Sequence, residues 1–249
     1  MDYRELDRLL ARASDPQLIP GIYNYCDGRC PRCPFSTRCL TYLEGQEAKP
    51  EDAGGSPADA LGGSLRRTFG MVAAIARREG VDVPVAGAAA ERTARADPDR
   101  HRRDPLVARA EEYTRLAWRV SRAIAPVVSA RGDPSAIDAV AAIEWFSTRV
   151  SSKIYRAVVG HLEGWEPEGK LQTDFNGSAK VARLWIVESR RAWGVLMEAG
   201  KATADGVPAQ AVAMLDALDT AVRARFPHAM AFVRPGFDEA AGGDSRERS

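Results

Sequence analysis

The sequence of 249 residues lacks any uninterrupted apolar run that approaches about 18 residues, the length that a transmembrane helix requires. It also lacks an excess of either charge, because 35 Lys and Arg nearly balance 34 Asp and Glu. A general attraction to nucleic acid or to an anionic membrane is therefore not indicated. The opening MDYRELDRLL is acidic and amphipathic, without the basic start and apolar stretch of a secretory signal. These absences predict a cytoplasmic protein.

Histidine is scarce and strand-like patterns are lacking. The three histidines are His101, His161 and His228, and no Ser/His/Asp set, phosphate-binding glycine loop or dinucleotide fingerprint accompanies them. Whether the protein is an enzyme is therefore left open. Apolar residues recur at helical spacing, and no stretch alternates apolar and polar residues as a strand would. The sequence predicts an all-α fold.

Four long helices are predicted in the C-terminal half, at about 105–131, 134–161, 178–199 and 208–226. The pairs Asp104-Pro105 and Asp133-Pro134 each supply an N-cap and a first-turn proline. The tight turn at Gly132 makes the first two helices antiparallel neighbours, so we predict an up-down four-helix bundle. The first helix carries its apolar residues at alternating spacings of four and three: Leu106, Ala110, Tyr113, Ala117, Val120, Ile124 and Val127.

Composition divides the chain into four parts. Residues 1–45 are predicted to form an N-terminal helix and a cysteine loop, and the Gly- and Pro-rich 46–63 a flexible linker. Residues 64–239 are predicted to form the bundle, with a helix at 64–80 whose apolar face includes Leu65, Phe69 and Val72, and with a C-terminal arm. Residues 240–249 are predicted to be disordered. The basic segment at 85–103 has no interleaved aromatics, so a nucleic-acid partner is not supported, although clustered arginine leaves it open.

All four cysteines lie between Cys26 and Cys39, in the segment CDGRCPRCPFSTRC. In a reducing cytoplasm, thiols clustered this closely are more often metal ligands than disulfides. We therefore predict one metal centre held by Cys26, Cys30, Cys33 and Cys39. Tyr23, Tyr25, Phe35 and Tyr42 are predicted to pack around it. Little other apolar material surrounds the loop, so the metal is predicted to be needed for its folding.

The spacing of these cysteines favours a [4Fe-4S] cluster, with zinc as the alternative. Structural zinc usually takes two Cys-x2-Cys turns, and only Cys30 and Cys33 form one. Iron–sulfur clusters are commonly held by cysteines at unequal short spacings, often with a proline beside a ligand. Here Pro31 follows Cys30 and Pro34 follows Cys33. The backbone amides of Gly28, Arg29 and Arg32 are predicted to point toward the cluster sulfurs.

Two resemblances rest on these residues. PRCPFSTRC resembles the end of the [4Fe-4S] loop in endonuclease III-type DNA glycosylases, with Cys30, Cys33 and Cys39 at the last three cysteine positions. Cys26 departs from that pattern and the helix-hairpin-helix signature is missing, so the resemblance implies a cluster loop and not glycosylase activity. More of the chain resembles a group of uncharacterised bacterial helical proteins with IPGIYNYCDxxCxxCPxxxRC, NGSAKVA and AFxRPGFDE. That resemblance implies that the four thiols act as one unit, and it supplies no activity.

Other charged groups have two interpretations each. Inward-facing carboxylates of helix bundles hold the metals of di-iron proteins, usually together with a histidine three residues after a glutamate. No histidine follows Glu144 or Glu188 by three residues. Pairing with surface arginine is therefore favoured for the mid-helix carboxylates Glu112, Glu144, Glu188 and Asp216. The basic stripe Arg149, Lys153 and Arg156 either receives an anionic ligand or forms a solvated helix face. His161 is predicted to lie at the C-terminal end of its helix, where the helix dipole favours a cationic side chain.

These patterns predict a metal-binding protein with a redox, sensing or accessory role. The alternative is a structural zinc site on a helical scaffold that binds another protein. A protein partner is expected under either hypothesis, and a membrane partner is not.

Overall fold

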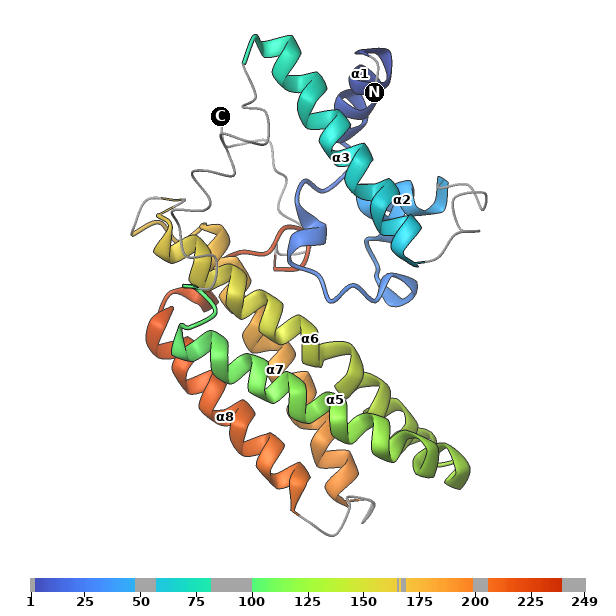
Figure 1. Ribbon diagram of the computed structural model, residues 1–249, viewed down its shortest axis with the longest axis vertical. Helices are drawn as coiled ribbons and strands as arrows, with labels where there is room; N and C mark the ends of the chain where they lie inside the picture. Colours follow the sequence, from blue (N-terminus) through green and yellow to red (C-terminus); the bar gives the residue numbers. More distant parts are fainter. Residues whose placement is uncertain are drawn as a thin grey trace. The chain divides into compact units, whose positions relative to one another are not determined.

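The computed structural model describes residues 3–47, 57–81, 100–164, 166, 169–198 and 206–238 (Figure 1). Within these ranges the regular structure is helical throughout and contains no strand, which confirms the all-α class. The chain forms two compact units, the first from Met1–Asp97 with Pro235–Ser249 and the second from Pro98–Arg234. The second unit is therefore inserted between two segments of the first. The predicted tail and most of the basic segment at 85–103 lie outside the described residues.

The second unit contains four long helices, α5 (Pro105–Arg131), α6 (Pro134–Leu162), α7 (Asp174–Glu198) and α8 (Val207–Arg225). Within this unit, α5 contacts α6 and α8, and α7 contacts the same two helices (Figure 1). The short 3-10 turn η5 (Ala229–Ala231) follows α8 and packs on α7. All four helices fall close to their predicted positions.

The caps of α5 and the N-cap of α6 were predicted correctly. Asp104 accepts a hydrogen bond from the Leu106 N–H at 2.9 Å, and Asp133 accepts one from the Ser135 N–H at 3.0 Å. Gly132 ends α5 with a φ of 69°, a left-handed conformation that suits glycine. These local signals fix both helix boundaries, so the connection is as short as the sequence predicted.

The core of the second unit follows the predicted spacing with one correction. On α5 the predicted apolar positions are buried as far as Ile124, but Val127 is 51% exposed and Val128 is 1% exposed. An α-helix turns once in 3.6 residues, so a strict four-three repeat drifts around the helix and the buried position moves along by one. Tyr113 and Trp193 lie fully buried, and the Trp193 Nε1–H donates to the Tyr113 hydroxyl at 3.2 Å.

The third helix of the unit, α7, begins four residues earlier than predicted, at Asp174. The Thr173 hydroxyl accepts from the Asn176 N–H at 3.2 Å and serves as the helix cap. Further along α7, the buried Lys180 ammonium donates to the Phe232 carbonyl at 2.6 Å and to the Met230 carbonyl at 3.4 Å. The start of the predicted arm is therefore held on α7.

The first unit contains α1 (Tyr3–Ala13), α2 (Leu40–Glu47) and α3 (Pro57–Glu79). Arg12 of α1 pairs with Glu47 of α2 at 2.9 Å, and Arg78 of α3 pairs with Asp7 of α1 at 2.8 Å. These ion pairs and the packing of α1 on α3 place α3 in the first unit. The sequence had instead predicted the helix at 64–80 in the same domain as the bundle.

Helix α3 also corrects the linker boundary and the predicted apolar face. It begins at Pro57, because a first-turn proline followed by Ala, Asp, Ala and Leu favours a helix, so 57–63 are helical and not linker. The remaining linker residues 48–56 lie outside the described residues. Ala74 and Ala76 are buried, whereas Leu65, Phe69 and Val72 are exposed, Phe69 to 69%. We call these three residues the α3 apolar stripe.

Candidate metal centre

The cysteine loop connects α1 to α2 through three single-turn 3-10 helices, η1 (Ile22–Asn24), η2 (Cys30–Arg32) and η3 (Ser36–Arg38). Gly28, with a φ of 72°, turns the chain between Cys26 and η2, and Pro31 lies in the first turn of η2. The Ile19 N–H donates to the Arg38 carbonyl at 3.0 Å and closes the base of the loop. The predicted glycine and proline turns thus fold the segment back on itself.

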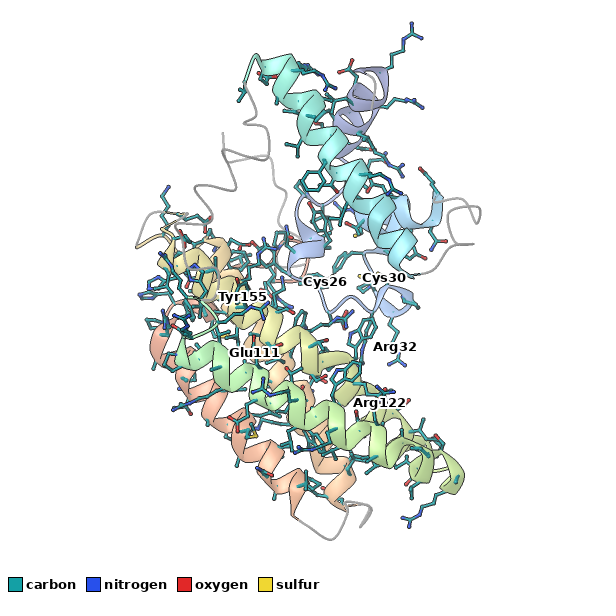
Figure 2. The ribbon with its side chains drawn as sticks, in the orientation of Figure 1. Cys26, Cys30, Arg32, Glu111, Arg122 and Tyr155 are labelled. Atoms are coloured by element: carbon teal, nitrogen blue, oxygen red, sulfur yellow. The ribbon has the colours of Figure 1, made fainter. Side chains whose placement is uncertain are left out.

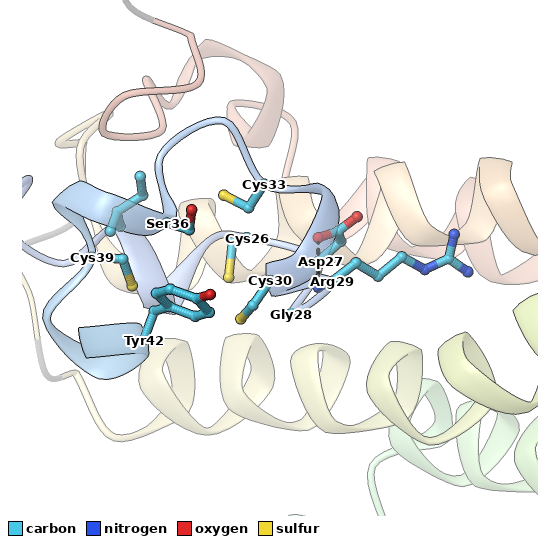
Figure 3. A pocket seen from close by; sticks show the side chains of 10 residues that line it. Cys26, Asp27, Gly28, Arg29, Cys30, Cys33, Ser36, Cys39 and Tyr42 are labelled. Atoms are coloured by element: carbon cyan, nitrogen blue, oxygen red, sulfur yellow. Dashed lines mark hydrogen bonds between the residues drawn. The ribbon is translucent and has the colours of Figure 1, made fainter. Parts of the chain in front are cut away.

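All four cysteines line one pocket (Figure 3). The space between the lining atoms is about 300 Å³, including the part that is open to solvent. All four are free thiols; Cys39 is buried, and Cys26, Cys30 and Cys33 are half-buried. The pocket is completed by Ile22, Asp27, Gly28, Arg29, Ser36 and Tyr42. The structure therefore brings the four predicted ligands together.

Their arrangement is looser than the coordination sphere of a single ion. Among the described residues, no three His, Cys, Asp or Glu side chains stand close enough together to hold one metal ion as they are placed. Four sulfurs around one zinc ion lie roughly 3.8 Å apart, given a Zn–S bond of about 2.3 Å and tetrahedral geometry. The four thiols share a pocket without being drawn to that spacing.

One of the three predicted amide contacts to sulfur is present. The Gly28 backbone N–H donates to the Cys26 sulfur. The Arg29 N–H instead donates to the Asp27 carboxylate at 2.9 Å, and the Arg32 N–H donates to the Arg29 carbonyl at 2.9 Å. The prediction for Arg29 and Arg32 was wrong, because an Asx turn and a 3-10 turn already use these two donors.

The surroundings of Cys26 make its thiol less acidic. Burial raises the pKa of Cys26, and the hydrogen bond from Gly28 opposes this increase. The negative charges of Asp27, Cys39 and Cys30 add smaller increases. The thiolate form of Cys26 is thus disfavoured, and a bound cation would compensate.

Basic residues outnumber acidic ones in the loop. Between Cys26 and Cys39 the sequence holds Arg29, Arg32 and Arg38 against Asp27 alone. Arg29 lines the pocket, whereas the exposed Arg32 extends away from Cys26 and Cys30 (Figure 2). The Arg38 Nε–H donates to the Gln17 carbonyl at 3.0 Å and supports the base of the loop. Of the three arginines, only Arg29 therefore lies at the pocket, and Asp27 lines the pocket beside it.

A small apolar cluster supports the pocket from below. Ile19, Ile22 and Cys39 form its buried centre, and the half-buried Phe35, Tyr42 and Phe237 pack against them. The rings of Phe35 and Phe237 meet edge to face, with centroids 5.2 Å apart and planes at 87°. Phe35 and Tyr42 take the predicted role, whereas Tyr23 is 46% exposed and does not.

Phe237 was missed as a site residue, because it lies about 200 positions from the loop and was assigned to an arm on the bundle. Next to it, Gly236 has a φ of 76°, and a Cβ there would lie 3.0 Å from the Ile19 Cδ1 and 3.1 Å from the Ile22 Cδ1. The available signal was that the resemblance noted above includes both IPGIYNY and RPGFDE, since Gly236 packs on Ile19 and Ile22.

The mid-helix carboxylates do not form a site. All four are exposed, namely Glu112, Glu144, Glu188 and Asp216. Glu188 pairs with Arg191 at 2.6 Å, and Asp216 pairs with Arg190 at 3.0 Å. For these two carboxylates, the predicted pairing with surface arginine is confirmed.

The basic stripe on α6 is half-buried and engaged within the second unit. The Arg149 guanidinium lies over the Trp145 ring, 3.5 Å from its centroid. Arg156 holds both carboxylate oxygens of Asp174, at 2.7 and 2.8 Å. A fully solvated face is therefore not what the structure shows, because Arg149 lies on a ring of its own helix and Arg156 joins α6 to the start of α7.

The fold and the pocket together define an all-helical protein with four thiols gathered in one loop. Comparisons with models of protein families, with curated proteins and with solved structures find no match for the chain. No helix in the described part of the chain has both the length and the apolar character needed to cross a membrane.

Proposed function

We propose that the first unit binds one [4Fe-4S] cluster through Cys26, Cys30, Cys33 and Cys39, and that the cluster serves a redox, sensing or accessory role. The observation that carries the proposal is the single pocket lined by all four thiols of the chain. Free thiols in every case agree with the reducing cytoplasm that the proposal requires.

The spacing of the thiols along the sequence favours a cluster over a single zinc ion. In a [4Fe-4S] cluster each cysteine binds a different iron. Unequal short spacings with proline beside a ligand, as between Cys26 and Cys39, are typical of such clusters. The Gly28 N–H at the Cys26 sulfur and the nearby Arg29 suit the negative charge of a thiolate-bound cluster.

The second unit is the scaffold in this proposal. We take it as an up-down four-helix bundle, supported by the contacts of α5 and α7 with both α6 and α8 and by the short turn at Gly132. Its mid-helix carboxylates are exposed, so the metal chemistry is assigned to the first unit alone.

The test is elemental analysis with visible absorption on anaerobically purified protein. We expect about four irons and four acid-labile sulfides per chain, with brown colour. Cys33→Ser removes one ligand and should lose most of the iron. Ser36→Ala changes a residue of the same pocket that bears no thiol, and it should retain the full iron content. A colourless protein with one zinc and no sulfide would refute the cluster.

The alternative remains a structural zinc site on a protein-interaction scaffold. It is favoured by the α3 apolar stripe, which the first unit exposes. Under this alternative a helical partner would bury Phe69, chelation would loosen the first unit, and redox agents would change nothing. Phe69→Ser would then weaken partner binding without altering zinc content.

A further inference from the structure

The second unit contains a pocket that the proposed metal centre does not use. It lies where the end of α6, the start of α7 and the end of α8 meet, and its volume is about 220 Å³. Pockets that bind drug-sized molecules typically measure about 300–1,000 Å³. The size therefore suits a smaller, compact organic ligand.

One side of this pocket is an aromatic wall. Phe175 and Phe226 are 9% and 3% exposed, with ring centroids 6.3 Å apart. The imidazole of His161 meets both rings edge on, at 5.5 and 5.8 Å between centroids. Three rings from three helix ends therefore pack against one another at this side of the pocket, and they make it apolar.

The other side is basic. Lys170, Arg225 and His228 line the pocket, and none of the described residues that line it is acidic. Arg225 is fixed by Asp104 through a 2.7 Å ion pair. The buried Asn176 amide donates to the Lys170 carbonyl at 3.2 Å, which fixes the backbone that carries Lys170. Arg225 is therefore held by an acidic partner, and the exposed Lys170 is carried by a backbone segment that Asn176 fixes.

We propose that this pocket binds a small molecule with a planar apolar body and a carboxylate. The body lies against Phe175 and Phe226, and the carboxylate faces Lys170 and Arg225. A neutral aromatic compound leaves the basic side unpaired, and inorganic phosphate leaves the aromatic wall unused. The combination of both surfaces in one pocket assigns the class of ligand.

The experiment titrates the full-length protein with 2-naphthoate while the imidazole resonances are followed by NMR. The chain has only three histidines, so each resonance is assigned with one His→Gln variant. We expect saturable shifts in the millimolar range at His161 and His228, which line the pocket, and smaller changes at His101, which does not.

Two variants separate this site from general charge attraction. Lys170→Gln should weaken binding about three- to fivefold, the loss expected for one exposed charge pair. Arg109→Gln removes the same charge from the exposed side of α5 and should leave the affinity unchanged. The proposal is overturned if no saturable shift occurs at His161 and His228, or if 2-naphthalenemethanol or inorganic phosphate produces the same shifts as 2-naphthoate. Equal weakening by both variants would also overturn it.

Discussion

Replacing Gly236 by alanine tests whether the C-terminal segment supports the cysteine pocket. The new Cβ would adopt a φ of 76°, which costs a non-glycine residue about 1–2 kcal/mol. It would also approach Ile19 and Ile22 to 3.0 and 3.1 Å, and such overpacking typically costs about 1–3 kcal/mol. Together these effects predict a loss of about 2–5 kcal/mol in the packing of this segment on the loop.

The assay is alkylation of Cys39 in reduced, chelator-treated protein, followed by mass spectrometry. Cys39 is 8% exposed and part of the apolar cluster with Phe237, so it reacts mainly after the segment detaches. A loss of 2 kcal/mol raises the detached population about 30-fold, and the labelling rate should rise accordingly. The half-buried Cys26, Cys30 and Cys33 should change much less.

Gly80→Ala is the matched control, because Gly80 lies in the same unit with a φ of 65° and no atom within 4 Å of a new Cβ. It carries the backbone cost without the clash and should leave Cys39 labelling within about twofold. If Gly236→Ala labels Cys39 no faster than Gly80→Ala does, the packing of Gly236 on Ile19 and Ile22 does not protect the pocket.

The remaining predictions concern the second unit. Burial raises the pKa of Tyr113, so the folded state keeps this phenol neutral. In the unfolded chain the phenol ionises with a pKa of about 10. The free energy of unfolding should therefore fall as the pH rises above that value. Between pH 8 and 10.5, the free energy of unfolding in urea should fall less for Tyr113→Phe than for the wild type. At pH 8 the variant should itself be less stable by about 1 kcal/mol, because the Trp193 N–H loses its acceptor. Ile186→Ala, at a fully buried position, should lower the free energy of unfolding by about 2–5 kcal/mol without altering metal content; loss of metal would contradict the assignment to the first unit. Asp104→Asn keeps the helix cap but breaks the pair with Arg225, at a cost of about 1 kcal/mol, and a double-mutant cycle with Arg225→Gln should show coupling.

Local signals in the sequence were sufficient for the helices of the second unit. Asp104, Gly132 and Asp133 act through neighbours two to four positions away, so their roles follow from residue type alone. The apolar face of α5 was also readable, apart from the drift that exchanged Val127 for Val128. Spacing likewise brought the four cysteines into one loop, since 14 residues with two prolines and a glycine turn sharply.

Contacts between distant segments were not readable in the same way. Nothing in the local pattern of α3 says that Ala74 and Ala76 are buried instead of the larger Phe69. Helical spacing shows which residues share a face, but the partner that buries a face is chosen by tertiary packing. The same limit hid Phe237, whose aromatic ring has no periodic neighbour and packs on Phe35 from the other end of the chain.

The position of Phe237 raises the question of whether the second unit must fold before the pocket can close. The Asp104–Arg225 ion pair shows that the chain enters and leaves the second unit at one end of it. Folding of that unit therefore shortens the loop between Phe35 and Phe237 from about 200 to about 80 effective residues, which lowers the closure cost by about 0.8 kcal/mol. That is less than the loss of about 2–5 kcal/mol predicted above for Gly236→Ala. The pocket should depend mainly on its own packing, so Ile186→Ala should change Cys39 labelling by no more than about fourfold even when the second unit is largely unfolded. An increase as large as that of Gly236→Ala would show instead that the two units unfold together.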